Sequence, residues 1–304
     1  MELETNFAKL LFVQTEEPNN INARTTEYLE NLEREQALIN PTPNNPPWKT
    51  PAAIGVWIFS ILLIIFLPFL FVIPYAVSQK GNFADMEAVA NFLKGDTTAI
   101  ILNILAIIPA HILTLLLAWF VITRKNTYSF RQTLGWSSGG FRWFYYILIV
   151  VVFFAIAAAV NYLLPDRGNE LERILRSSRT AVFIVAFLAT FTAPLVEEVI
   201  YRGILYSAFQ RSIGRAGAVV IVTALFALVH VPQYWGSPGT ILLICLLSLV
   251  LTLVRVKTDN LLPCVILHTI FNGLQSLLLV LEPYLPKELK PLEEQAGIIL
   301  HIFK

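Results

Sequence analysis

The stretch "APLVEEVIYRGILYSAF", residues 193–209, places three charged residues in an otherwise apolar part of the chain. Glu197, Glu198 and Arg202 follow an apolar run that is long enough to approach the middle of a bilayer. Ionisable side chains at that depth cost free energy, so they are rare there and mark functional sites by default. We therefore expect these three residues to belong to a site inside a membrane.

The overall composition is that of a membrane protein. Of the 304 residues, 56% are hydrophobic and 14% are charged, whereas soluble domains average about 45–50% apolar and about 25% charged residues. A net charge of +1 argues against electrostatic binding of nucleic acid. The two cysteines, Cys245 and Cys264, lie in apolar runs and indicate neither a disulfide scaffold nor a cysteine zinc site. We expect membrane lipid as a partner, and no nucleic acid.

Uncharged runs of about 20 residues predict the transmembrane helices. Residues 216–254 contain no Asp, Glu, Lys or Arg, which is too long for one crossing, and "VPQYWGSPG" (231–239) predicts a turn within them. The sequence therefore predicts an all-α polytopic integral membrane protein with about seven to eight transmembrane helices. The seven apolar runs are 52–77, 99–123, 143–164, 180–210, two within 216–254, and 261–281.

Four regions follow one another along the chain. Residues 1–50 are polar and rich in Asn and Pro, and "PTPNNPP" (41–47) is typical of a spacer, so a largely disordered N-terminal arm is expected. The accessory transmembrane helices are expected in 51–165, the core with the charged motif in 178–284, and an interfacial tail in 285–304. The first residues are acidic where a signal peptide is basic, so we expect the spans themselves to hold the chain in the membrane.

The charged motif divides into a pair and a single residue. Glu198 and Arg202 are four residues apart, so on a helix they can form an ion pair. Glu197 is rotated from Glu198 by about 100° and has no cation on its own helix. A structural charge cluster would account for Glu198 and Arg202, but it would not account for Glu197.

Other polar residues in the apolar runs are few. His230 ends the fifth run, and His268 and Asn272 are four residues apart on one face of the seventh. Polar groups of this kind also join membrane helices to one another, so a structural role stays open for each. His111 has no partner at helical spacing and is expected to be structural, beside a kink at Pro109.

The fourth, fifth and seventh runs thus each present one polar face, and nothing comparable is evident in the first, third or sixth. A carboxylate, two imidazoles and a carboxamide in a dry cavity can activate water and stabilise an oxyanion. The same groups could bind a proton or a cation in a transporter, or belong to a non-catalytic scaffold. Glu and two His could also hold zinc, but neither an HExxH zinc motif nor a GxSxG serine elbow is present.

Three motifs stand on separate apolar runs: "EEVIYR" (197–202), "FALVH" (226–230) and "HTIFN" (268–272). They resemble the EExxxR, FxxxH and HxxxN motifs of the CPBP family of intramembrane glutamic proteases. This family, also called the CAAX protease or Abi family, is related to the Ras-converting CAAX prenyl endopeptidase. The resemblance covers roughly residues 180–282.

The resemblance implies a membrane-embedded endopeptidase that hydrolyses a peptide bond of a membrane-associated substrate, such as a prenylated CAAX protein. Four residues would be catalytic, with the first activating water, the second assisting it and the last two stabilising the oxyanion: Glu197, His230, His268 and Asn272. Glu198 and Arg202 would orient the site. The resemblance implies no obligatory metal, so zinc is not favoured. A multi-pass protein of a bacterial inner membrane, or of an internal membrane of a photosynthetic cell, is expected.

Overall fold

The computed structural model describes residues 40–79, 86–164 and 170–284. The expected tail and most of the expected N-terminal arm lie outside them. Among the described residues, six helical runs are long and apolar enough to cross a membrane, which confirms an all-α polytopic membrane protein. These runs are Thr50–Ser78 (α3), Thr97–Thr123 (α5, Thr97–Leu105, and α6, Ile107–Thr123), Trp143–Leu163 (α8), Arg179–His230, Pro238–Thr258 (α13) and Leu262–Tyr284 (α14, Leu262–Leu281, and a final 3-10 turn).

Shorter helices lie between the membrane runs, and one long run is subdivided. The short helices are α4 (Met86–Gly95), α7 (Phe130–Leu134) and α9 (Glu170–Ser177). The long run alternates between α-helix and the wider π-helix, in the order α10 (Arg179–Phe187), η2 (Leu188–Thr192), α11 (Ala193–Glu198), η3 (Val199–Leu205) and α12 (Tyr206–His230).

The run from Arg179 to His230 is two antiparallel helices rather than one. Its 52 residues would span about 78 Å as a straight helix, against a hydrocarbon core of about 30 Å. The backbone breaks at Gly214, with φ 79° and ψ 168°, a conformation that is essentially restricted to glycine. The rings of Tyr201 and Phe226 consequently lie 5.0 Å apart, whereas a straight helix would separate them by about 37 Å. This break agrees with the expected division between the fourth and fifth spans.

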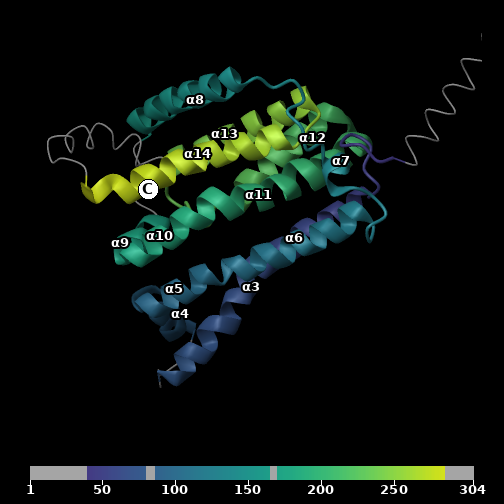
Figure 1. The fold of residues 1–304 in the computed structure, drawn as a ribbon. Helices are drawn as coiled ribbons and strands as arrows, with labels where there is room; N and C mark the ends of the chain where they lie inside the picture. The colour runs from purple at the N-terminus through teal and green to yellow at the C-terminus, as the bar shows by residue number, and fades with distance from the viewer. Residues whose placement is uncertain (1–39, 80–85, 165–169, 285–304) are drawn as a thin grey trace, which may run out of the picture. The chain divides into compact units, whose positions relative to one another are not determined.

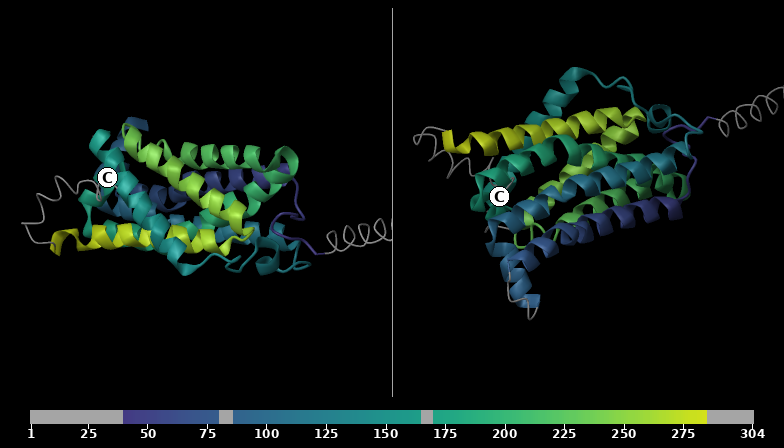
Figure 2. Two further views of the ribbon diagram at one scale, coloured as in Figure 1. Left: turned by 90° about the horizontal axis from the view of Figure 1, so that it is seen from above. Right: turned by 60° about the horizontal axis from the view of Figure 1, so that its bottom comes forward.

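Residues 179–284 form the middle of the helical assembly (Figures 1 and 2). On one side, α3 and α6 pack along each other, and both contact η3. On the other side, α8 packs against α13 and α14. The segment with the three motifs is therefore enclosed by the helices that precede it in the chain.

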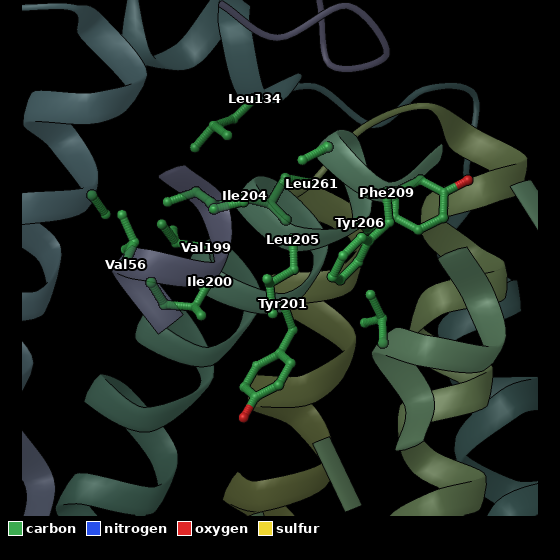
Figure 3. Close-up of a cluster of buried hydrophobic side chains, with 14 of the residues drawn as sticks. Val56, Leu134, Val199, Ile200, Tyr201, Ile204, Leu205, Tyr206, Phe209 and Leu261 are labelled. Atoms are coloured by element: carbon green, nitrogen blue, oxygen red, sulfur yellow. The ribbon is translucent and has the colours of Figure 1, made fainter. Parts of the chain in front are cut away.

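The largest apolar cluster surrounds η3, in which all seven residues are buried (Figure 3). Helices α3, α6 and α12 contribute to this cluster through Val56, Ile122 and Val222. Burying so many apolar side chains around η3 fixes the backbone that follows the two glutamates, since interiors are closely packed.

Residues 43–49, which include most of the predicted spacer (41–47), are packed against the helices, and we call them the N-terminal strap. The indole nitrogen of Trp48, which is 4% exposed, donates to the carbonyl of Ile204 at 3.0 Å. The buried guanidinium of Arg255 donates to the carbonyl of Pro43 at 2.8 Å and to Oδ1 of Asn44 at 3.3 Å. Prolines prevent a helix here, and the strap instead supplies oxygen acceptors to Nη2 of a buried guanidinium.

Candidate active site

The two π-helices flank the glutamates, with η2 before α11 and η3 after it. A π-helix carries an extra residue per turn, shifts the face on which later side chains lie, and is frequent at functional sites. Side-chain donors bond to carbonyls within η2: Nδ2 of Asn272 donates to Ala189 at 2.9 Å, and the hydroxyl of Thr192 donates to Leu188 at 3.2 Å. Polar side chains thus stabilise the irregular backbone beside Glu197.

Glu198 and Arg202 form the ion pair that their spacing predicts. Nη1 of Arg202 lies 2.9 Å from Oε1 of Glu198, and both side chains are 0% exposed. Arg202 also donates to the carbonyl and the hydroxyl of Ser248, both at 2.9 Å, and to the hydroxyl of Thr252 at 3.3 Å. Its guanidinium lies 4.7 Å from the ring centroid of Phe226. These contacts offset the desolvation of a buried cation, which is otherwise costly.

The prediction that the sixth run has no comparable polar face is therefore wrong. Ser248 and Thr252 lie on α13 and are both buried. Two hydroxyl residues at a spacing of four in an apolar helix are the signal that could have revealed them, because that spacing places both on one face.

His268 connects the two glutamates. Its Nδ1 lies 2.8 Å from Oε1 of Glu198, and because an ionised carboxylate only accepts, Nδ1 carries the hydrogen. Its Nε2 then faces Oε2 of Glu197 at 3.8 Å. The side chain of Glu197 is 25% exposed and that of Glu198 is 0% exposed. Two adjacent carboxylates thus differ fully in their surroundings, and only Glu197 is accessible.

His230 and Asn272 are held near this group by other contacts. Nδ1 of His230 donates to the carbonyl of Phe226 at 2.7 Å, so in the neutral ring Nε2 keeps its lone pair. The ring of Phe226 lies 4.7 Å from that of His230 and 6.1 Å from that of His268, measured between centroids. Asn272 is bound to η2 rather than to its helical neighbour His268.

His111 has no partner at helical spacing on its own helix, but it contacts a residue of another segment. Its Nδ1 lies 2.9 Å from the hydroxyl oxygen of Thr192 in η2. Since that hydroxyl donates its hydrogen to Leu188, it accepts from Nδ1 of His111. His111 is buried on α6, so an accessory helix reaches the backbone beside Glu197.

No three side chains of His, Cys, Asp or Glu gather closely enough to hold a metal ion, as far as residues 40–79, 86–164 and 170–284 show. The arrangement offers instead an accessible carboxylate, an imidazole oriented by a buried carboxylate, and a second imidazole with a directed Nε2. These groups can exchange protons with water and stabilise negative charge.

Residues 179–274 match a family model that is described as "Type II CAAX prenyl endopeptidase Rce1-like". Neither a curated protein nor a solved structure matches the chain. The match contains all three motifs and confirms the resemblance to the CAAX protease (CPBP) family. Residues 179–274 are thus similar to a family of CAAX-type peptidases, and they lie in a chain whose helices are those of an integral membrane protein.

Proposed function

We propose that this protein hydrolyses a peptide bond of a membrane-associated substrate with water activated by Glu197. The observation that carries the proposal is the difference between the two adjacent glutamates. Glu198 is 0% exposed, and its Oε1 is bound by both Arg202 and His268, so it is not accessible from outside. Glu197 is partly exposed and faces Nε2 of His268 at 3.8 Å. A water molecule can bridge two polar atoms at this separation.

The reaction begins when Glu197 accepts a proton from that water, with Nε2 of His230 assisting. The water oxygen adds to the carbonyl carbon of the peptide, and the carbonyl oxygen becomes an oxyanion. His268 stabilises the oxyanion by donating through Nε2–H in its protonated form, while Glu198 accepts from Nδ1 and orients the ring, as the acid of a catalytic triad does. Asn272 donates through the amide hydrogen that is not bound to Ala189. The C–N bond then breaks, and Glu197 passes its proton to the leaving amine.

The proposed substrate class is a prenylated C-terminal peptide. The matching family is described as a CAAX prenyl endopeptidase, and a site among apolar helices would suit a lipid-modified peptide. In this role Arg202 and Glu198 orient His268 and do not touch the substrate. No metal takes part in the proposed reaction.

The test uses the full chain in lipid vesicles with a farnesylated CAAX peptide, and follows release of the terminal tripeptide by mass spectrometry. We expect the wild type to cleave this peptide and Glu197→Gln to lose cleavage. The same peptide without its prenyl group is the control for lipid recognition, and slower cleavage of it is expected. A wild type that releases nothing from either peptide contradicts the proposal and favours a scaffold that binds without catalysis.

A further inference from the structure

Tyr201 is a buried residue with a hydroxyl group that lies beside the site. The three motifs do not specify it. It occupies a variable position of the EExxxR motif and is 5% exposed. Its ring packs edge-on against that of Phe226, with centroids 5.0 Å apart. The hydroxyl points away from the apolar cluster around η3 (Figure 3). This orientation places the hydroxyl group beside Phe226, whose ring lies near those of both His230 and His268.

The direction of the Tyr201 hydroxyl is set by a helix outside the matched segment. Nε1 of Trp57, on α3, lies 3.0 Å from the hydroxyl oxygen of Tyr201. An indole nitrogen can only donate, so the oxygen accepts this bond and its own hydrogen must point elsewhere. Among residues 40–79, 86–164 and 170–284, no hydrogen-bond acceptor is recorded for that hydrogen.

Two carboxylates precede Tyr201 closely. Glu198 is turned toward Arg202 and His268, which leaves Glu197 as the acceptor that we assign. Tyr201 follows Glu197 by four residues, a spacing that places two side chains on one side of a helix. Arg202 bonds to Glu198 at the same offset of four residues, at 2.9 Å, so the backbone here does bring side chains at this spacing together. Glu197 uses Oε2 toward His268, which leaves Oε1 for a second donor.

We propose that Tyr201 is a positioning residue for Glu197: its hydroxyl, fixed as a donor by Trp57, holds the carboxylate in the orientation that accepts the proton of water. The inference rests on the proposed function and deepens it, because it gives the accessory helix α3 a part in the reaction. The residues that the structure describes show no direct hydrogen bond between the two side chains, so the hydroxyl acts on Glu197 through an intervening water molecule, and no covalent change of Tyr201 is involved.

The decisive variants are Tyr201→Phe, Trp57→Phe and the double variant. Tyr201→Phe keeps the ring that packs on Phe226 and removes only the hydroxyl. We expect kcat to fall about 10-fold or more with KM unchanged, as for the loss of one preorganised polar contact. Trp57→Phe should lower kcat less, because the hydroxyl remains but loses its fixed direction. The double variant should match Tyr201→Phe in kcat, since Trp57 acts only through the hydroxyl.

A purely structural bond between α3 and η3 predicts a different pattern. Both single variants would then lower Tm and leave kcat unchanged, and the double variant would recover part of the lost Tm. Trp48→Phe is the matched control, because it removes another indole hydrogen bond to η3 far from any hydroxyl of the site. We expect it to lower Tm without changing kcat. Equal kcat values for Tyr201→Phe and the wild type would overturn the inference.

An infrared measurement separates this inference from the proposed function. The carboxylate band of Glu197, identified by its loss in Glu197→Gln, reports hydrogen bonding to Glu197 without any substrate. We expect this band to shift in Tyr201→Phe. An unshifted band overturns the inference whatever the activity of the protein. Cleavage that survives Glu197→Gln contradicts the proposed function instead, so the two failures are seen in different measurements.

Discussion

Replacing Arg202 by Met should be among the most destabilising single changes in the core of this protein. Arg202 and Glu198 are both 0% exposed and lie 2.9 Å apart, and three further hydrogen bonds join Arg202 to Ser248 and Thr252. Methionine fills a similar volume but leaves the carboxylate of Glu198 buried with His268 as its recorded partner. Breaking a buried ion pair in this way costs about 3–5 kcal/mol.

That cost corresponds to a decrease in Tm of roughly 6 °C or more. The assay is thermal unfolding of the purified protein in detergent, followed by circular dichroism and by tryptophan fluorescence. Glu198→Gln combined with Arg202→Met removes both charges and should recover a substantial part of the loss. Arg215→Met is the control, because Arg215 is exposed and a surface change of this kind shifts stability by about 0.5 kcal/mol or less. An Arg202→Met variant as stable as the control, or a double variant whose loss is the sum of the single losses, would refute the reasoning.

Three further outcomes are expected. Gly214→Ala should lower the free energy of unfolding by about 1–3 kcal/mol, since φ 79° with ψ 168° is strained for alanine. The control Gly55→Ala, with open space around it in α3, should be neutral or stabilising. Equal unfolding free energies for the two variants would contradict this prediction. Asn272→Ala leaves the carbonyl of Ala189 without its donor. Both kcat and the free energy of unfolding should therefore fall, the free energy by about 1–3 kcal/mol. An unchanged free energy of unfolding would refute the role of Asn272 in stabilising η2. Cleavage should persist in a chelator with no bound metal detected by elemental analysis, and activity restored only by added zinc would contradict the metal-free reaction.

The membrane-spanning runs could be predicted from the sequence because the cost of burying a charge in lipid dominates their composition. The break between the fourth and fifth spans was expected between residues 210 and 216, and it lies at Gly214. The turn expected at 231–239 lies between the end of α12 at His230 and the start of α13 at Pro238. The ion pair of Glu198 and Arg202 was predictable for a related reason, since it is local and depends only on helical spacing.

Contacts between segments that are distant in the chain could not be predicted from the sequence. His268 bonds to Glu198 across 70 residues, and Asn272 bonds to Ala189 although it shares a helix face with His268. These contacts depend on how η2 and η3 rotate the residues between them, and no residue type signals a π-helix reliably. The strap at residues 43–49 escaped prediction because it binds Arg255, which is more than 200 residues away in the chain.

The most direct test of the account measures binding and cleavage separately in Glu197→Gln. If Glu197 activates water, this variant should bind the farnesylated peptide with a Kd close to that of the wild type. Its cleavage rate should fall by about 100-fold or more, in the range that a lost general base produces. Because Glu198 and its partners are untouched, Tm should stay unchanged. Cleavage within a few-fold of the wild-type rate would contradict the assignment of Glu197 as the base.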